Sequence, residues 1–508
     1  WWQMATEAST ETACLHPLPQ SLSRWLSITH KSDKRLATIR SLPLPSSLSL
    51  TLCLRQGVAS DREPLSIAHH CSAVREATSS HRKFVSASIP TRMNRDVIER
   101  DVIVIGGGAA GFFAAIACAE ANPGLSVTIL ERGPRVLHKV LISGGGRCNV
   151  THACFEPAEF VTRYPRGKRE LLGPFHRHGA AWVVEWFQTR GVKLKSEEDG
   201  RIFPVTDNSE TIASCLIQAA EDAGAAIRTR QSVTGVEQNP DGSFHIRCSD
   251  EATWHCRKLM VATGGLKPGS PMDSLTSLGH SIEPLAPSLF TFHIDDARLA
   301  DLQGLSVNDA EVSVLGTKLQ ERGPILVTHW GLSGPAILKI SAWGARALQK
   351  LEYRFECRIN WIPDAAYEEV LQGLKAMKNI EGKKQVAASR PFDLPRRIWE
   401  RLVAQAGIQH GMTWSQAGAM ALKKLAGELT ACDFHVTDKS MNKEEFVTCG
   451  GVSLKEVDFK TMESRKVANL YFGGEVLDID GITGGFNFQS AWTTGFIAGQ
   501  AMAADEFA

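Results

Sequence analysis

The stretch Asp101–Glu131, DVIVIGGGAAGFFAAIACAEANPGLSVTILE, decides the fold. It begins with the apolar run Val102–Ile105, which is typical of a buried parallel strand. Glycines follow at GxGxxG spacing, an Ala-rich helical segment runs to Glu120, and a second strand ends at Glu131. This acid comes about 20 residues after the last glycine, where a dinucleotide fingerprint places one. The order strand, glycines, helix, strand and acid predicts a Rossmann-type dinucleotide fold.

Each position of this fingerprint has a physical role. Gly106 permits the tight turn, Gly108 leaves room for a pyrophosphate, and Gly111 lets the helix lie against the strand. The helix N-terminus offers free N–H groups and a partial positive charge to the diphosphate. Glu131 can accept hydrogen bonds from the adenosine ribose, and its charge would repel a 2′-phosphate there. A glycine-rich turn without a ligand is the alternative interpretation.

The composition is that of an ordinary globular protein. The chain has 508 residues with a net charge of +1, 22% charged and 43% hydrophobic residues. This size allows about two to four domains, and the balanced charge gives no support to a nucleic-acid role. The twelve cysteines include no CxxC pair, which favours reduced thiols and an intracellular location. No apolar run reaches about 18 residues, so we expect no membrane span.

Residues 1–95 do not resemble a folded core. They are rich in Ser, basic residues outnumber acidic ones roughly two to one, and no sustained period is present. The first Met is Met4, and Met93 lies just before the first strand. We expect either an organelle transit peptide, which implies a plastid or mitochondrial protein, or a non-native extension upstream of a cytoplasmic protein.

A second glycine cluster follows the fingerprint. The segment Ile142–Asn149 reads ISGGGRCN, with Lys139 before it. Three consecutive glycines flanked by Ser, Arg and Asn can wrap a polar ligand through backbone N–H groups, with Arg147 available to a phosphate or an anionic ring. A mobile surface loop is the alternative.

Five stretches together resemble one known family, in order and over about residues 98–500. They are ISGGGRCNVTH at 142–152, GRIFPVTDNS at 200–209, ATGG at 262–265, THWGLSGPAIL at 328–338 and LYFGGEVLDIDGITGGFNFQSAWTTGFIAG at 470–499. The family is the bacterial NAD(P)/FAD-dependent oxidoreductases of the BaiN type, also called YhiN-like or aminoacetone-oxidase-like. The resemblance implies bound FAD. Members of the family have been assigned the reduction of unsaturated oxo-steroid bile acids or the oxidation of aminoacetone.

We expect an α/β protein with a two-dinucleotide-fold-type FAD-binding Rossmann domain that carries two insertions. Segments 227–236, 244–248 and 258–262 are predicted strands of the first domain, and short alternating segments after Ser288 predict an antiparallel barrel. No second strand-GxGxxG-helix unit is visible, so a dedicated nicotinamide domain is not expected. The predicted parts are an extension at 1–95, the FAD-binding domain at 98–287 and 436–508, a β-barrel-like subdomain at 288–362 and a helical subdomain at 363–435.

The closing part of the chain repeats the pattern of glycine turn and helix. Gly484 and Gly485 precede a helix predicted over 490–501, whose N-terminus can face the N1–C2=O edge of a flavin. A plain C-terminal helix is the alternative. Many flavoproteins have Gly-Asp at the ribityl contact, whereas this chain has Gly474-Glu475, so either Glu475 or Asp478 reaches the ribityl chain.

The resemblance, together with the glycine motifs, assigns a set of residues to the cofactor and none to a metal. Val233 falls where related flavoproteins hold adenine through backbone atoms. The predicted cofactor residues are Gly106, Gly108, Ala109, Ala110, Gly111, Glu131, Arg132, Lys139, Ser143, Gly144, Gly145, Gly146, Arg147, Asn149, Val233, Ala262, Thr263, Gly264, Gly474, Glu475, Asp478, Gly484, Gly485, Phe486 and Asn487.

Three side chains are candidates for proton transfer, since a flavin supplies the electron chemistry itself. His329 lies in a turn-rich segment that enters a helix, although a His held by a backbone carbonyl is an equal alternative. Cys148 lies beside the glycine loop, where a packing role is favoured over a redox thiol. His152 is the third candidate.

Two functions fit these observations. The first is an FAD-dependent oxidoreductase that passes a hydride between the flavin and a small enone-like, steroid-like or amine substrate, with NAD(P)H or O2 as the second redox partner. It needs no nucleic-acid partner, and the sequence does not fix the oligomeric state. The second is a flavin-binding protein that modifies tRNA or acts as a redox-sensing interaction protein.

Overall fold

The structure is a computed structural model that describes residues 97–440 and 447–504. The predicted extension at 1–95, with its transit-peptide and start-site alternatives, lies outside the described residues. Within these ranges no helix is both long enough and apolar enough to cross a membrane.

A sheet with a parallel centre forms the core of the nucleotide-binding part, in the order β21-β9-β1-β2-β6. Strand β1 lies between β2 and β9, and Val102–Ile105 are buried, as the apolar run predicted. The strands of this sheet are β1 (Ile98–Ile105), β2 (Val127–Leu130), β6 (Ala226–Arg228), β7 (Val233–Gln238), β8 (Phe244–Cys248), β9 (Thr253–Val261), β19 (Val457–Asp458), β20 (Glu463–Ser464) and β21 (Leu470–Phe472).

The prediction of one strand over 227–236 is wrong. The structure has two strands here, because Arg230 adopts a φ of +58° and its N–H donates to the carbonyl oxygen of Gly133. The chain therefore leaves the parallel sheet after β6. It then re-enters as β7, which pairs antiparallel with β8.

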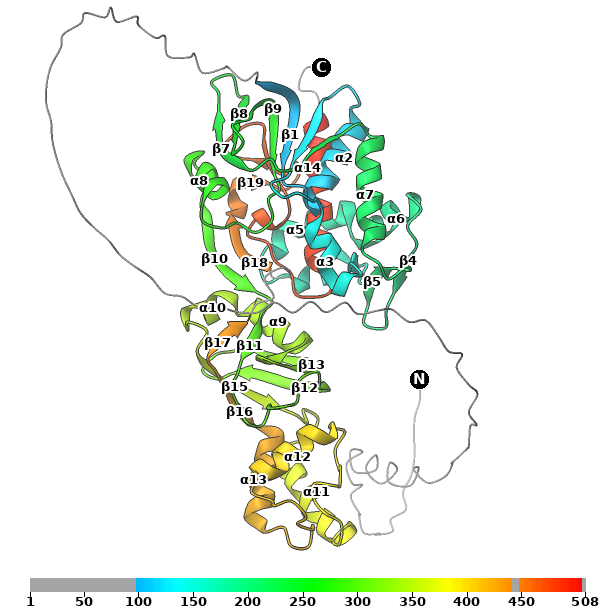
Figure 1. Cartoon of the computed structure of the whole chain (residues 1–508), viewed down its shortest axis with the longest axis vertical. Helices are drawn as coiled ribbons and strands as arrows, with labels where there is room; N and C mark the ends of the chain where they lie inside the picture. Colours follow the sequence, from blue (N-terminus) through cyan, green and yellow to red (C-terminus); the bar gives the residue numbers. More distant parts are fainter. Residues whose placement is uncertain (1–96, 441–446, 505–508) are drawn as a thin grey trace, which may run out of the picture. The chain divides into compact units, whose positions relative to one another are not determined.

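Helices cover this sheet, and Figure 1 shows α2 and α14, from opposite ends of the described chain, packed side by side. The helix α2 is almost wholly buried, which explains why its Ala-rich sequence carries no polar face. The helices of this part are α2 (Ala109–Ala121), α3 (His138–Gly146), α4 (Pro157–Phe160), η1 (Val161–Arg163), α5 (Lys168–His178), α6 (Ala180–Thr189), α7 (Glu210–Asp222), α8 (Ser270–Ser277), η2 (Leu454–Glu456), η3 (Gly474–Val476) and α14 (Phe486–Ala503).

Two smaller sheets adjoin this layer. The strands β3 (Thr151–His152), β4 (Leu194–Ser196) and β5 (Arg201–Pro204) form one of them. The other is the antiparallel pair of β10 (Ile282–Ser288) and β18 (Val447–Val452). In the described chain these two strands lead into and out of the inserted segments.

The first inserted part is an antiparallel sheet in the order β16-β15-β12-β13-β14-β11-β17. Only Thr437 separates β16 from β17, so one stretch of chain pairs with both ends of the sheet, as in a closed barrel. Its strands are β11 (Thr291–His293), β12 (Ser306–Val314), β13 (Gln320–Thr328), β14 (Gly331–Ser333), β15 (Phe355–Asn360), β16 (Cys432–Val436) and β17 (Asp438–Ser440), with helices α9 (Pro335–Trp343) and α10 (Ala345–Lys350) between them.

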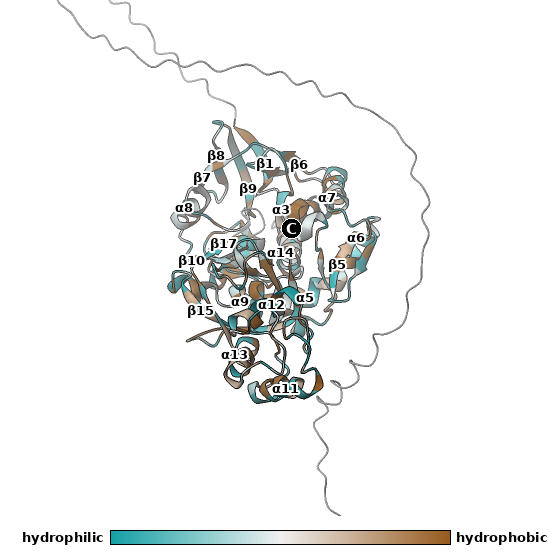
Figure 2. Cartoon of the chain, turned by 60° about the horizontal axis from the view of Figure 1, so that its bottom comes forward, coloured by the Kyte–Doolittle hydropathy of each residue, from teal (hydrophilic) through white to brown (hydrophobic). Residues whose placement is uncertain are grey.

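The second inserted part is helical and lies between β15 and β16 in the chain. It consists of α11 (Tyr367–Ile380), α12 (Arg396–Gln405) and α13 (Ala419–Thr430). Figure 2 shows both hydrophilic and hydrophobic residues along these helices, and α11 buries Val370, Leu371, Leu374 and Met377 at helical spacing. The predicted class, α/β with a Rossmann-type domain and barrel-like and helical insertions, is confirmed.

Candidate functional site

The glycine turn between β1 and α2 combines tight packing with one open position. A Cβ on Gly106, where φ is +113°, would lie 2.4 Å from the carbonyl oxygen of Ala262, and a Cβ on Gly111 would lie 2.0 Å from that of Gly106. By contrast, apart from its own chain neighbours, no described residue has an atom within 4 Å of the place where a Cβ on Gly108 would be. Gly106 and Gly111 are therefore required for packing, whereas Gly108 keeps free space in front of the helix.

The N-terminus of α2 is left for a ligand. Its N-cap Gly108 provides no side-chain hydrogen bond, and no acid occupies the first turn. Glu131 holds the turn, since its Oε2 accepts from the Gly107 N–H at 2.9 Å and its Oε1 from the Gly133 N–H at 2.6 Å. Each carboxylate oxygen keeps a further lone pair for a ribose hydroxyl. Arg132 follows Glu131 and is exposed.

The end of β9 brings a buried, unpaired hydroxyl to the same edge of the sheet. The Ala262 N–H donates to the carbonyl oxygen of Ile105, and the next residue, Thr263, has a buried Oγ1 without a hydrogen-bond partner among the described atoms. A buried hydroxyl of this kind normally has a partner. Thr263 also lines a small cavity with Val233 and Ile105. The structure therefore brings the predicted residues Thr263 and Val233 together, beside the last residue of β1.

Glu475 is a second acid at this edge, besides Glu131. Its Oε2 pairs with Lys139 Nζ at 2.6 Å, and its Oε1 accepts from the Thr448 N–H at 2.8 Å. A Cβ on Gly264 would lie 3.8 Å from Glu475 Oε2. Asp478 is engaged elsewhere, because its Oδ1 accepts from the Gly450 N–H at 3.1 Å and from Arg346 at 2.9 Å. Glu475 therefore lies beside Lys139 and Gly264, whereas Asp478 lies beside Gly450 and Arg346. Which of the two acids reaches the ribityl chain stays a prediction.

Sequence reasoning missed Thr448 and Thr494 in this region. A Cβ on Gly265 would lie 2.4 Å from Thr448 Oγ1, and Thr494 Oγ1 accepts from the Gly474 N–H at 2.9 Å. Thr448 adjoins the Gly450-Gly451 pair, a signal that was present in the sequence. Nothing in the pattern around Thr494 distinguishes it from other helix residues.

The second glycine cluster is a sharp reversal at the end of α3. Gly144, Gly145 and Gly146 have φ values of +59°, +69° and +81°, a left-handed series that only glycine adopts without strain. Within residues 97–440 and 447–504, only the adjoining residues of the loop come within 4 Å of where a Cβ on Gly145 or Gly146 would be. Ser143 Oγ donates to the Val140 carbonyl oxygen at 2.9 Å, within α3. The loop therefore presents bare backbone on its outer side.

Arg147 is already paired in this structure. It contacts Glu197 at 2.6 Å and lies 4.0 Å from the centre of the Phe203 ring. The hydrogen bond to Glu197, together with the charges of Glu197 and Asp207, raises the pKa of the guanidinium. A phosphate contact for Arg147 stays a prediction. Phe203 belongs to the GRIFPVTDNS stretch, although its role under the loop was not predicted.

The start of α14 is built like that of α2. Gly485 has a φ of +91°, and the helix has neither a side-chain cap nor an acid in its first turn. Asn487 and Asn149 bond to the backbone of the loop that leads into α14. Asn487 exchanges two hydrogen bonds with the Gly481 backbone at 2.8 and 2.9 Å. In the amide orientation that satisfies its surroundings, Asn149 accepts from the Gly485 N–H at 3.0 Å. Phe486 stacks on His152, with ring centres 5.0 Å apart.

The two helices run in the same direction and are offset along their axes. A Cβ on Gly495 would lie 2.3 Å from the Ala110 carbonyl oxygen, one on Gly499 would lie 2.3 Å from that of Ala114, and Asn122 bonds the Ala503 carbonyl oxygen. The first residue of α14 therefore precedes the level of Ala110 by nine residues, or roughly 13 Å of helix. Two free N-termini at this offset suit a ligand with a diphosphate at one end and an electron-accepting ring at the other. The residues present thus fit FAD.

The proton-transfer candidates lie in different surroundings. Burial raises the pKa of the Cys148 thiol to about 12, and the side chain is fully buried, which favours a packing role. Burial lowers the pKa of His152, which contacts the Asp199 carbonyl oxygen at 3.1 Å. His329 is exposed in the turn between β13 and β14. Among the described residues, no hydrogen bond links His329 to Cys148, whose thiol interacts with Ser143.

Comparisons with known proteins agree with this construction. The family model described as the HI0933-like protein Rossmann domain matches residues 100–501. A ribosomal RNA dihydrouridine synthase of Escherichia coli is 31% identical over 410 residues, which are 79% of this chain and 97% of that protein. A 3-dehydro-bile acid delta(4,6)-reductase of Clostridium scindens is 28% identical over 411 residues, 79% of this chain and 98% of that protein.

Among solved structures, the comparison finds a 3-ketosteroid-delta4-(5alpha)-dehydrogenase of Rhodococcus jostii. It is 14% identical, with a TM-score of 0.46, and the match covers 82% of this chain and 99% of that one. The family match spans most of the chain and includes both glycine turns. The predicted resemblance is confirmed: the chain belongs to the HI0933-like Rossmann family, in the BaiN/YhiN-like group, and is an FAD-dependent oxidoreductase.

Proposed function

We propose that the protein reduces a carbon–carbon double bond conjugated to a carbonyl group, and that its substrate is the uracil ring of ribosomal RNA. The observation that carries the proposal is a bond change shared by the names of two near full-length relatives. Dihydrouridine is uridine whose C5=C6 bond, conjugated to the C4 carbonyl, is saturated. A delta(4,6)-reductase of a 3-dehydro acid acts on double bonds conjugated to a 3-oxo group.

The proposed reaction balances with a reduced nicotinamide as the reductant. NAD(P)H, one proton and the conjugated substrate give NAD(P)+ and the saturated product. Bound FAD supplies the hydride carrier between the two substrates. The chain itself must hold the dinucleotide, orient the double bond and deliver a proton to the carbon next to the carbonyl.

The described residues divide these tasks. The open position at Gly108 and the free N-terminus of α2 support the diphosphate, and Glu131 supports the ribose. Glu475, whose Oε2 would lie 3.8 Å from a Cβ on Gly264, is our candidate for the ribityl contact. The free N-terminus of α14 supports the edge of the ring where negative charge gathers on reduction.

His329 is our candidate for proton delivery. Its imidazole is exposed and lies in a short turn, whereas the Cys148 thiol is fully buried with a pKa of about 12. Replacing His329 by Gln keeps the size and polarity but removes the titrating group. We expect the rate of substrate reduction to fall by about 10²-fold or more, with unchanged reduction of the flavin by NAD(P)H. An unchanged rate and pH profile would remove this residue from the mechanism.

The substrate is tested by anaerobic reduction and reoxidation. The purified protein is reduced with NADH and separately with NADPH, then mixed with protein-free ribosomal RNA, free uridine, a 3-oxo-Δ4 steroid or aminoacetone. We expect RNA to reoxidise the flavin, with a mass gain of two hydrogens in a uridine. Reoxidation by the steroid alone would assign the small-molecule role instead. Flavin that only aminoacetone reduces and O2 reoxidises would assign an amine oxidase.

A further inference from the structure

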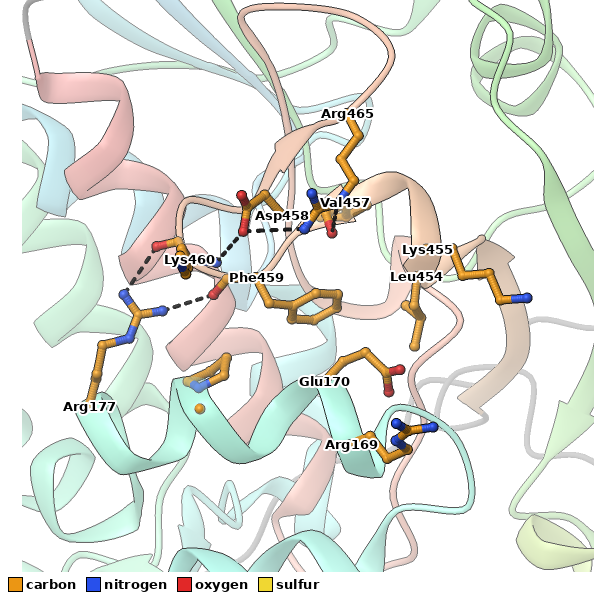
Figure 3. A pocket seen from close by; sticks show the side chains of 12 residues that line it. Arg169, Glu170, Arg177, Leu454, Lys455, Val457, Asp458, Phe459, Lys460 and Arg465 are labelled. Carbon is orange, nitrogen blue, oxygen red and sulfur yellow. Dashed lines mark hydrogen bonds and ion pairs between the residues drawn. The ribbon is translucent and has the colours of Figure 1, made fainter.

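A groove of about 890 Å³ lies between α5 and the segment Leu454–Arg465, apart from the residues that fit FAD. Figure 3 shows α5 on one side, with Arg169, Glu170 and Arg177, and the η2–β19 segment on the other. The Phe459 ring extends between the two walls. None of the residues assigned above to FAD or to proton delivery lines this groove.

The groove is strongly basic. Of its twelve lining residues, five are cationic and two are acidic, whereas the whole chain has a net charge of only +1. The cations are Arg169, Arg177, Lys455, Lys460 and Arg465. A local excess of positive charge in a concave surface attracts polyanions.

Most of these charges are not neutralised by the protein. In the part of the chain that the structure describes, Arg169, Lys455 and Lys460 have no carboxylate at ion-pair distance. Arg177 donates to the backbone carbonyl oxygens of Phe459 and Lys460, at 2.8 and 3.0 Å, and so keeps its full charge. Arg465 is the one cation of the five with an ion-pair partner among the described residues, namely Asp458 at 3.6 Å.

The spacing of the cations suits an extended anion rather than one phosphate. Arg169 and Arg177 are eight residues apart on α5, which is roughly 12 Å of helix. The lysines lie on the opposite wall. Charges along both walls track a sugar–phosphate backbone, and a half-buried aromatic ring such as Phe459 offers a stacking surface for a base.

We propose that this groove binds the backbone of the RNA substrate next to the uridine that is reduced. The inference rests on the proposed function, because a steroid or amine substrate would give the groove no polyanion to bind. NADPH is the competing occupant, since it also carries several phosphate charges.

The test uses the full-length holoprotein with Arg169→Ala, Lys455→Ala and Lys460→Ala combined. The control combines Arg390→Ala, Lys375→Ala and Lys424→Ala, which remove the same charge from exposed positions of the helical insertion. Binding of labelled oligo(U) and of protein-free ribosomal RNA is measured by anisotropy over a range of salt concentrations. FAD content and the thermal midpoint verify that both variants are folded.

We expect the groove variant to bind RNA about tenfold more weakly or worse. The slope of log K against log salt should fall by about 2, since each lost phosphate contact on a single strand accounts for about 0.7. The control should bind like the wild-type protein. Equal RNA binding by the wild-type, groove and control proteins, or no RNA binding by the wild type, overturns the inference. Weaker binding of NADPH with unchanged RNA binding assigns the groove to the nucleotide instead.

Failure of the proposed function has a different signature. In that case the groove variant still loses RNA affinity, but no protein produces dihydrouridine in the RNA. If the function holds and the inference fails, the wild-type protein and the groove variant produce dihydrouridine with the same KM for RNA.

Discussion

Gly495 on α14 lies directly against the backbone of Ala110 on α2, so that a Cβ on Gly495 would lie 2.3 Å from the Ala110 carbonyl oxygen. This contact joins the first turn of α2 to the middle of a helix that comes almost 400 residues later in the chain. It fixes the offset between the two free helix N-termini. The fit to FAD depends on that offset.

Replacing Gly495 by Val should separate the two helices. Overpacking of a close contact costs about 1–3 kcal/mol, and displaced N-termini would hold the cofactor more weakly. We expect a lower thermal midpoint and less FAD per chain. The control is Gly427→Ala on α13, where nothing lies within 4 Å of the new Cβ and where helix propensity favours Ala by up to about 1 kcal/mol. A Gly495 variant with full FAD content and unchanged stability would contradict this account.

Loss of the ion pair between Arg166 and Asp480 should reduce stability more than the Gly495 substitution does. The Asp480 side chain is 0% exposed, and it also accepts from Ser288 Oγ at 2.9 Å. Arg166 donates to the Ala342 carbonyl oxygen in α9, so the pair joins the nucleotide-binding part to the inserted sheet. Because Asp480→Ala leaves the Arg166 guanidinium, whose side chain is only 13% exposed, without its partner, the free energy of unfolding in urea should fall by about 3–5 kcal/mol.

An exposed ion pair provides the comparison. Arg322 and Asp309 pair with side chains 43% and 49% exposed. Asp309→Ala should change the free energy of unfolding by less than about 1 kcal/mol. If Asp480→Ala and Asp309→Ala lowered the free energy of unfolding by similar amounts, burial would not explain how the Arg166–Asp480 pair stabilises the fold.

The parts of the fold that the sequence predicts are those encoded by neighbouring residues. The fingerprint 101–131 predicts strand, turn, helix and acid, because each depends on a local run or on one glycine. The helix α5 was not predicted. Its sequence KRELLGPFHRH contains Pro174 and buries only Leu171, Pro174 and Phe175, so no apolar period is visible.

Pairings across long sequence separations were equally invisible. Lys139 meets Glu475, and Arg147 meets Glu197, through the tertiary fold rather than through any repeated spacing. The sequence indicates Lys139, Arg147 and Glu475 as candidates, but it gives no sign of Glu197. It does not predict which of them neutralise each other, and this is why the choice between Glu475 and Asp478 stayed open.

Glu456 predicts a pH dependence of stability. Burial raises its pKa, but hydrogen bonds from Lys466, Ser281 and His280 outweigh burial and bring it to about 2, against 4.5 for a free Glu. A carboxyl with a depressed pKa stabilises the fold fully above the unfolded value and loses that contribution as the pH falls from 4.5 towards 2. The stability difference between the wild-type protein and Glu456→Gln should therefore shrink over this range.

Urea unfolding at a series of pH values measures that difference. Glu198→Gln is the matched control, because Glu198 is exposed and has no ion-pair partner in residues 97–440 and 447–504. Its effect on stability should be small at every pH. A Glu456→Gln difference that stays constant between pH 7 and the acid limit would show that the carboxylate charge is not what holds the segment beside His280.

Substitutions at Gly106 and at Gly108 should affect different properties of the protein, namely the stability of the fold and the binding of FAD. At Gly106, Ala would need a φ of +113° and would meet the Ala262 carbonyl oxygen at 2.4 Å, so the fold itself should lose about 1–3 kcal/mol or more. At Gly108 nothing lies within 4 Å of the new Cβ, so Leu should fit without disturbing the fold. Its side chain would instead fill the space in front of α2, where the diphosphate is expected.

We therefore expect Gly108→Leu to give a protein that unfolds like the cofactor-free wild type but retains little or no FAD. Gly106→Ala should unfold at a lower temperature even when both proteins are stripped of cofactor. Thermal unfolding of the stripped proteins and the flavin absorbance after reconstitution separate the two effects. If Gly108→Leu binds FAD as the wild type does, the diphosphate does not lie at the N-terminus of α2, and the cofactor position argued from the offset of α2 and α14 is wrong.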